Sequence, residues 1–146
     1  KKEIVEYLIM NGADVNSQDK NGETPLFIAL RVRNIAFMKM LVEKGASLNT
    51  INKTGQTPLI ISIMYIKNYE LTDFLVQSGA NVNLATSYGE SPLTLAVFYG
   101  RIKEVELLLK KGANINFKNN ANETALDVAK KKRFNKMIGL LKQYSR

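Results

Sequence analysis

The 146-residue chain contains neither cysteine nor histidine. The absence of cysteine excludes disulfides, zinc–thiolate clusters and thiol nucleophiles. The absence of histidine removes another common metal ligand and the usual general base, so catalysis would have to depend on carboxylates, lysine or tyrosine. We therefore expect no metal site and no cofactor.

Long apolar runs are absent as well. No stretch approaches the ~18 apolar residues that could span a bilayer, and no signal segment opens the chain. With 45% hydrophobic and 23% charged residues, the composition is typical of a soluble folded domain. We expect a monomer, with the cytoplasm as its favoured location. Because the chain begins at Lys1, already inside an amphipathic pattern, we expect it to be a fragment of a longer protein.

Acidic residues become scarce toward the C-terminus. Residues 1–109 carry eleven basic and eleven acidic side chains, whereas residues 110–146 carry ten basic and two acidic ones, so the whole excess of +8 lies in the last quarter. Such a zone favours an acidic protein, nucleic acid or an anionic lipid surface as partner. The alternative is that this basic zone is a solvated end face that binds nothing. Among the possible partners, we expect nucleic acid to be less favoured than a protein.

A repeat of 33 or 34 residues runs through the chain. Its first marker is a Gly-Ala pair followed, after one variable residue, by a hydrophobic residue and Asn. These pairs begin at Gly12, Gly45, Gly79 and Gly112. Its second marker is found at Thr24-Pro25-Leu26, Thr57-Pro58-Leu59, Ser91-Pro92-Leu93 and Thr124-Ala125-Leu126.

Each marker has a mechanical explanation. A hydroxyl residue before proline starts a helix, because the hydroxyl accepts a hydrogen bond from a free backbone N–H and proline suits the first helical position. A glycine after an apolar, charged run ends a helix in a left-handed conformation. The polar residues between the end of one helix and the start of the next predict an extended hairpin that contains a turn. Each unit is therefore predicted to be a helix, a turn, a second helix and a hairpin loop.

The two markers resemble those of the ankyrin repeat, which has a period of 33 and a T-P-L-H-x-A signature. The resemblance covers the full chain and implies an all-α solenoid of stacked helix-turn-helix units joined by extended β-hairpin loops. The expected units are residues 1–18 (the end of a truncated repeat), 19–51, 52–85 (with a one-residue insertion), 86–118 and 119–146 (a C-terminal capping repeat).

Three features depart from the family pattern. The signature histidine is replaced by Phe27, Ile60, Thr94 or Asp127, so we expect more apolar packing at Phe27 and Ile60. The extra residue of the 34-residue unit is expected between its helices, within residues 65–69. The last unit has alanine in place of proline and asparagine in place of glycine, as expected of a cap with a polar outer face.

A catalytic interpretation rests mainly on Ser91. The run Gly89-Glu90-Ser91 resembles half of a nucleophile elbow, but the second glycine is Leu93 and no histidine is available. Ser91 also occupies the slot of three threonines, so we expect it to cap a helix. Glu104 and Glu106 differ by two positions and fall on different sides of a helix. We predict that the chain is not an enzyme.

The ankyrin resemblance implies that a partner binds a concave face built from hairpin tips and first helices. The helix positions expected there are Arg31, Val32, Met64, Tyr65, Phe98, Tyr99, Lys131 and Lys132. The tip positions are Lys20, Asn21, Glu23, Lys53, Thr54, Gln56, Ser87, Tyr88, Glu90, Asn120, Ala121 and Glu123.

The middle of this face is rich in large apolar and aromatic side chains, namely Met64, Tyr65, Tyr88, Phe98 and Tyr99. Aromatic residues are frequent in binding hot spots, so we predict a non-catalytic module that binds another protein there. The alternative is that several of them pack between repeats. Two other functions stay open: electrostatic binding through the basic C-terminal repeat, and service as a targeting domain of a larger enzyme.

Overall fold

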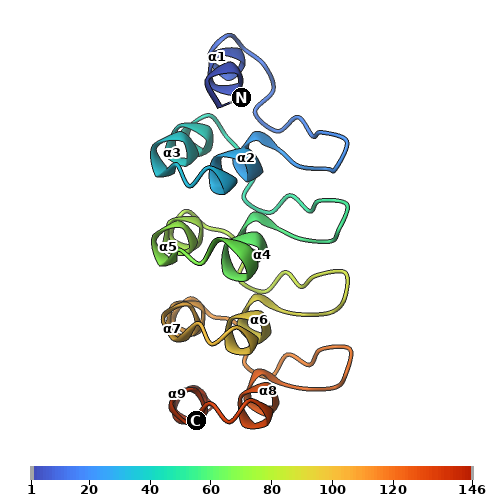
Figure 1. The fold of residues 1–146 in the computed structure, drawn as a ribbon, viewed down its shortest axis with the longest axis vertical. Coiled ribbons are helices and arrows are strands. Elements are labelled where there is room, and N and C mark those ends of the chain that lie inside the picture. Colours follow the sequence, from blue (N-terminus) through green and yellow to red (C-terminus); the bar gives the residue numbers. More distant parts are fainter. Residues whose placement is uncertain (1, 146) are drawn as a thin grey trace.

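The computed structural model describes residues 2–145, which fold into a stack of helix pairs (Figure 1). The helices are α1 (Lys2–Met10), α2 (Pro25–Arg31), α3 (Ile35–Glu43), α4 (Pro58–Ile61), the π-helix η1 (Ser62–Ile66), α5 (Tyr69–Gln77), α6 (Pro92–Phe98), α7 (Ile102–Lys110), α8 (Ala125–Lys131) and α9 (Asn135–Tyr144). No strand occurs within residues 2–145. The predicted all-α solenoid is therefore confirmed, and its hairpin-shaped loops form no β ladder in this range.

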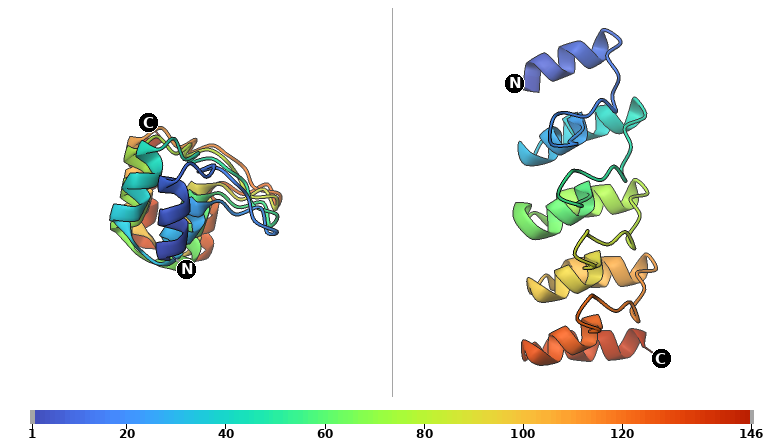
Figure 2. Two further views of the ribbon diagram at one scale, coloured as in Figure 1. Left: turned by 90° about the horizontal axis from the view of Figure 1, so that it is seen from above. Right: turned by 90° about the vertical axis from the view of Figure 1, so that its right-hand side faces the viewer.

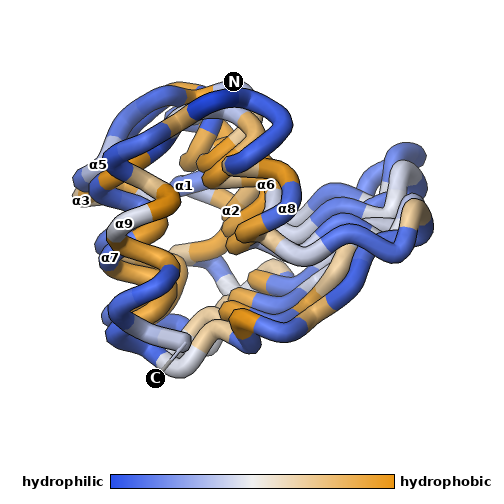
Figure 3. The backbone as a smooth tube through the Cα atoms, turned by 90° about the horizontal axis from the view of Figure 1, so that it is seen from below, coloured by the Kyte–Doolittle hydropathy of each residue, from blue (hydrophilic) through white to orange (hydrophobic). Residues whose placement is uncertain are grey.

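The helices form two layers. The first helices α2, α4, α6 and α8 lie next to the loops, and the second helices α3, α5, α7 and α9 lie on the far side of them (Figure 1). All the loops leave the stack on the same side (Figure 2). Hydrophobic residues gather where the two layers face each other, whereas the loop tips are mostly hydrophilic (Figure 3).

The core runs along the whole stack because equivalent residues of successive repeats are buried. One such series lies on the second helices and is fully buried at Leu41, Leu75, Leu108 and Leu141. Phe27 and Ile60, which stand where the family has histidine, are also fully buried. The expected apolar packing at these two positions is confirmed.

The first helices begin as predicted. At three of them the hydroxyl accepts a hydrogen bond from the backbone N–H three residues later: Thr57 from Ile60 at 3.2 Å, Ser91 from Thr94 at 3.1 Å and Thr124 from Asp127 at 3.3 Å. Ser91 is thus a helix cap, and it is buried. Thr24 differs, because its buried Oγ1 has no hydrogen-bond partner.

Asparagine side chains connect neighbouring repeats at three junctions of the stack. The Asn16 amide donates to the Gly45 carbonyl at 3.1 Å and its oxygen accepts from Ser47 N at 2.7 Å. Asn83 repeats this pattern with Gly112 and Asn114. In the repeat between them, Asn49 accepts from the Asn81 backbone at 2.8 Å. Bonds of this kind therefore hold neighbouring loops together along the stack.

The extra residue of the 34-residue repeat lies in its first helix. In each repeat a single left-handed residue precedes the second helix, at Arg33, Lys67, Gly100 or Arg133. Lys67 comes ten residues after Thr57, whereas the others come nine after their helix starts. The π-helical turn Ser62–Ile66 absorbs the difference and keeps Ile63 and Ile66 buried. The prediction of a longer loop between the helices was therefore wrong, and the helix is longer instead.

Candidate functional site

Each loop tip is a five-residue turn stabilised by its own first side chain. In the first one, the Asp19 carboxylate accepts from Asn21 N at 2.8 Å and Glu23 N at 2.9 Å. The hydrogen bond from Glu23 is the main reason why the pKa of Asp19 is lowered. Asn52 and Asn119 accept the equivalent pairs of bonds in their turns. The tips are therefore ordered structures that hold their side chains in fixed positions.

Neighbouring tips also contact one another. Lys53 N donates to the Asn21 carbonyl at 2.9 Å, and the Ser87 hydroxyl donates to the Thr54 carbonyl at 3.2 Å. The Asn119 amide donates to the Glu90 carboxylate at 2.9 Å. The tips thus form a continuous row opposite the first helices, and we call this row and the C-terminal ends of the first helices the loop–helix face.

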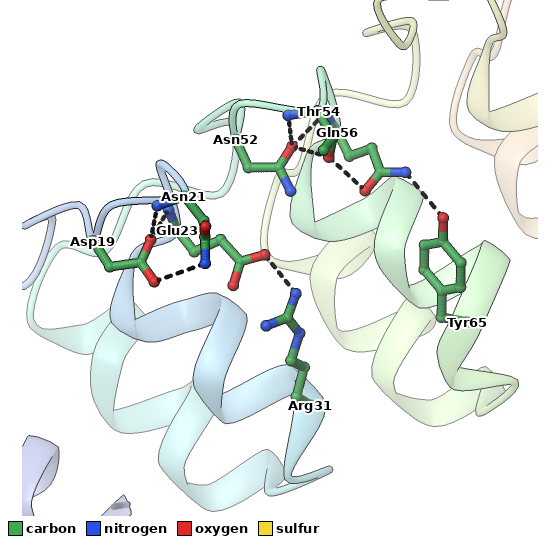
Figure 4. Close-up of polar contacts among 8 residues, drawn as sticks. All are labelled: Asp19, Asn21, Glu23, Arg31, Asn52, Thr54, Gln56 and Tyr65. Carbon is green, nitrogen blue, oxygen red and sulfur yellow. Dashed lines mark hydrogen bonds and ion pairs between the residues drawn. The ribbon is translucent and has the colours of Figure 1, made fainter.

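In three repeats, the last residue of the tip contacts the end of the first helix in the same repeat. In the first complete repeat, the Glu23 carboxylate pairs with the Arg31 guanidinium at 2.5 Å (Figure 4). In the last repeat, Glu123 pairs in the same way with Lys131. In each pair the two residues are eight positions apart in the sequence. One lies in a loop tip and the other in a first helix, so each pair joins the two parts of the predicted face.

The second repeat makes a neutral version of this contact. The Gln56 amide donates to the Tyr65 hydroxyl at 3.2 Å (Figure 4). The same amide also contacts the Met64 sulfur at 3.8 Å. Thr54 donates its hydroxyl hydrogen to the Gln56 oxygen at 3.1 Å. Because the π-helical turn adds a residue just before this point, two side chains instead of one meet the glutamine.

The third repeat lacks the contact. Phe98 stands where Arg31 and Lys131 stand in their repeats, and Glu90 accepts its hydrogen bond from Asn119 of the next loop. Burial raises the pKa of the Glu90 carboxyl, the Asn119 hydrogen bond opposes this shift, and the nearby Glu123 adds to it. The carboxylate is thus half-buried and forms no ion pair within residues 2–145.

The loop–helix face contains two hollows. The first has a volume of about 480 Å³ and the second about 260 Å³. The first is lined by Asn21, Glu23, Arg31, Asn52, Lys53, Thr54, Gln56, Ile61, Tyr65 and Ile66. The second is lined by Glu90, Thr94, Leu95, Phe98, Tyr99, Asn119, Glu123, Val128, Lys131 and Lys132.

The predicted aromatic residues are exposed. Tyr88 is 74% exposed, Tyr65 56%, Phe98 47% and Tyr99 39%, whereas Met64 is half-buried against the core. Met64 therefore packs against the core, whereas the four rings leave much of their surface exposed. Tyr65 lines the first hollow and Phe98 and Tyr99 the second, but Tyr88 lies at its tip and lines neither.

Phe98 and Tyr99 form a small aromatic cluster. Their ring centroids are 5.2 Å apart and their planes are nearly perpendicular, at 82°. The Lys132 ammonium lies 3.8 Å from the centroid of the Phe98 ring. This is a cation–π contact, which shows that the exposed face of Phe98 accepts a positive charge.

The basic C-terminal repeat contributes to the second hollow. Lys131 pairs with Glu123 and Lys132 covers Phe98, so two of the cations at the end of α8 are engaged on the loop–helix face. Lys130, Arg133, Lys136 and Lys142 are exposed. Asp127 is held in a capping box by Thr124, whose hydrogen bonds lower its pKa.

The remaining residues predicted for the face differ in their exposure to solvent. Val32 is exposed at the end of α2 and lines neither hollow. Glu23 is buried, and Gln56, Glu90 and Glu123 are half-buried. The exposed tip residues are Lys20, Asn21, Lys53, Thr54, Ser87, Asn120 and Ala121.

Sequence reasoning missed four contributors to the second hollow, namely Thr94, Leu95, Asn119 and Val128. Asn119 supplies the donor to Glu90, and Leu95 and Val128 supply part of the apolar lining. The recurrence of opposite charges eight residues apart, at Glu23 and Arg31 and again at Glu123 and Lys131, is a signal that could have revealed the tip-to-helix pairs.

No metal centre emerges from the described residues. Within residues 2–145, no group of three or more Asp or Glu side chains is placed to hold a metal ion. Glu104 is buried in α7, and the neighbouring Glu106 is half-buried. None of the helices described here is long and apolar enough to cross a membrane.

Comparison with known families identifies the repeat. A family model described as ankyrin repeats, in three copies, matches residues 1–86 and again residues 67–145. A search of curated proteins found no match. Ankyrin repeats are generally protein–protein interaction modules, and ankyrin repeat domains are typically non-catalytic.

Proposed function

Because the chain belongs to the ankyrin repeat family, we propose that it is a non-catalytic module that binds another protein on its loop–helix face. The observation that carries this proposal is the exposure of Tyr65, Phe98 and Tyr99 around two hollows on one face. Exposed rings beside a concavity are typical of partner sites, because they bury much apolar area at a small entropic cost.

The rigidity of this face supports the proposal. The tips are bonded internally, to one another and, in three repeats, to the first helices. A surface ordered before binding loses little conformational entropy when the partner arrives. The side chains around the hollows are therefore suited to a specific interaction.

The experiment is an affinity capture from cell extract with the immobilised array, in which each retained protein is then purified and titrated. The Tyr88→Ala/Tyr99→Ala double variant should weaken binding at least about tenfold, since hot-spot aromatics each contribute more than about 1 kcal/mol. The matched control is Tyr144→Ala, because Tyr144 is an exposed tyrosine on α9, outside the loop–helix face. Unchanged affinity of the double variant would refute the proposed site.

The electrostatic alternative predicts a different response. Binding through the basic C-terminal repeat would weaken steeply with added salt and would be lost after charge reversal at Lys130 and Lys136. These two lysines are exposed and line neither hollow, so reversing them leaves the loop–helix face intact. If charge reversal abolishes binding and the aromatic variant does not, the electrostatic function replaces the one proposed.

A further inference from the structure

Four equivalent residues end the loop tips, and they differ in their charge and in the cation that each one contacts. They are Glu23, Gln56, Glu90 and Glu123. Glu23 has Arg31 as its cation, Glu123 has Lys131, and Gln56 carries no charge. Glu90 forms no ion pair within the described chain, since its repeat has Phe98 at the cationic position. The third repeat therefore retains the acid of the pair and lacks the base.

The surroundings of Glu90 make this omission costly. Its carboxylate is half-buried and accepts a single hydrogen bond, from the neutral amide of Asn119 at 2.9 Å. An ionised carboxylate can accept about four hydrogen bonds, and burying it without a cation is unfavourable. The raised pKa of Glu90 has burial as its largest cause. A cation brought in from outside would therefore gain more here than at an exposed carboxylate.

The rest of the hollow suits the other parts of a basic side chain. Leu95 and Val128 offer apolar contact for a methylene stem, and the Phe98 and Tyr99 rings stand perpendicular to each other at the rim. A ring face within about 6 Å attracts a cation, and the Lys132 ammonium, at 3.8 Å from the Phe98 centroid, already uses this attraction. Lys132 is an exposed, flexible side chain, so it can leave the ring when another cation enters.

We propose that the hollow between α6 and α8 binds a lysine or arginine side chain of the partner protein, with Glu90 as its counter-charge and Phe98 as its aromatic contact. The inference rests on the proposed function and adds to it the chemistry of one subsite. The incoming side chain supplies the cation that Arg31 and Lys131 supply in their own repeats. Its stem covers the apolar lining while its charged end reaches the carboxylate.

The test is selection from a library of random linear peptides displayed on phage, followed by titration of the selected peptides in solution. We expect them to share one lysine or arginine, and replacement of that residue by norleucine or leucine to weaken binding about tenfold or more. Glu90→Gln keeps an oxygen that can accept from Asn119, so the variant should fold, and it should weaken binding to a similar extent. Glu43→Gln is the matched control, since Glu43 is an exposed carboxylate on α3 that lines neither hollow.

Each outcome is informative. Selected peptides without a shared basic residue, or with equal affinity for the Glu90→Gln variant, would overturn this inference. If such peptides still lose affinity for the Phe98→Ala/Tyr99→Ala variant, the proposed binding face stands without its basic subsite. Failure to enrich any peptide would count against the inference alone, because the affinity capture tests the face separately. A Lys132→Gln variant should bind the basic peptides more tightly, and weaker binding would contradict the expected displacement of Lys132.

Discussion

The contact between neighbouring loop tips can be tested by adding one methyl group at Gly55. Gly55 has a left-handed φ of +74°, and a Cβ built there would lie 2.4 Å from the Ser87 Cβ and 2.6 Å from the Ser87 backbone nitrogen. Gly45 has a similar φ of +86°, but a Cβ there meets nothing within 4 Å. Comparing alanine substitutions at Gly55 and Gly45 therefore separates the cost of backbone strain from the cost of steric overlap with the next repeat.

Both substitutions to alanine force a side chain into the left-handed region, at a cost of about 1–2 kcal/mol. Gly55→Ala must in addition push the Ser87 backbone away, and overpacking of this kind costs about 1–3 kcal/mol more. We therefore expect Gly45→Ala to lower the free energy of unfolding by about 1–2 kcal/mol and Gly55→Ala by about 2–5 kcal/mol.

Urea unfolding followed by far-UV circular dichroism measures both losses. Gly55→Ala should also weaken partner binding, because displacement of Ser87 moves the tip that carries Tyr88, whereas Gly45→Ala should not. Equal losses of stability in the two variants, within about 0.5 kcal/mol, would refute the conclusion that the tips pack directly on one another.

Two further predictions concern single groups whose partners are known. Thr57→Val removes a hydroxyl that accepts from Ile60 N and should cost about 1 kcal/mol in urea unfolding, whereas Thr24→Val removes a buried hydroxyl without a partner and should be neutral or stabilising. A larger loss for Thr24→Val than for Thr57→Val would contradict the capping geometry. The pKa of Glu90 is raised in the folded protein, so the folded state binds the carboxyl proton more tightly than the unfolded state does. Glu90 therefore lowers the free energy of unfolding as the pH rises from the ordinary carboxyl pKa through the raised value. Glu90→Gln should remove that loss. The measurement is the difference in unfolding free energy between the wild-type protein and the variant across this pH range. The other charged residues of the hollow are the same in both proteins, namely Glu123, Lys131 and Lys132.

The fold could be predicted from the sequence because its markers report backbone requirements. A hydroxyl before proline and a glycine after an apolar run act locally, and the structure places helix starts and ends at those residues. The position of the extra residue was not predictable in this way. Whether it extends a loop or a helix depends on which arrangement keeps Ile63 and Ile66 in the core, and that is a property of the packed repeat.

The candidate face was only partly predictable. Its residues follow from the ankyrin register, and the exposure of Phe98 and Tyr99 agrees with the expectation, although their binding of a partner stays a prediction. The state of Glu90 could not be read from its own repeat, because its hydrogen-bond donor, Asn119, comes from the next loop, 29 residues away. Contacts between repeats join residues that no local pattern relates.

The π-helical turn at Ser62–Ile66 lengthens one repeat by a residue without removing the bonds to its neighbours. The bond from the Asn81 backbone N–H to the Asn49 side-chain oxygen spans 32 residues, and the equivalent bond from Ser47 to Asn16 spans 31, yet both join one repeat to the next. A single residue gained at the end of a first helix therefore changes which side chains that helix places on the loop–helix face, as Met64 and Tyr65 do beside Gln56. The bonds to the neighbouring repeats remain in place on both sides of this repeat.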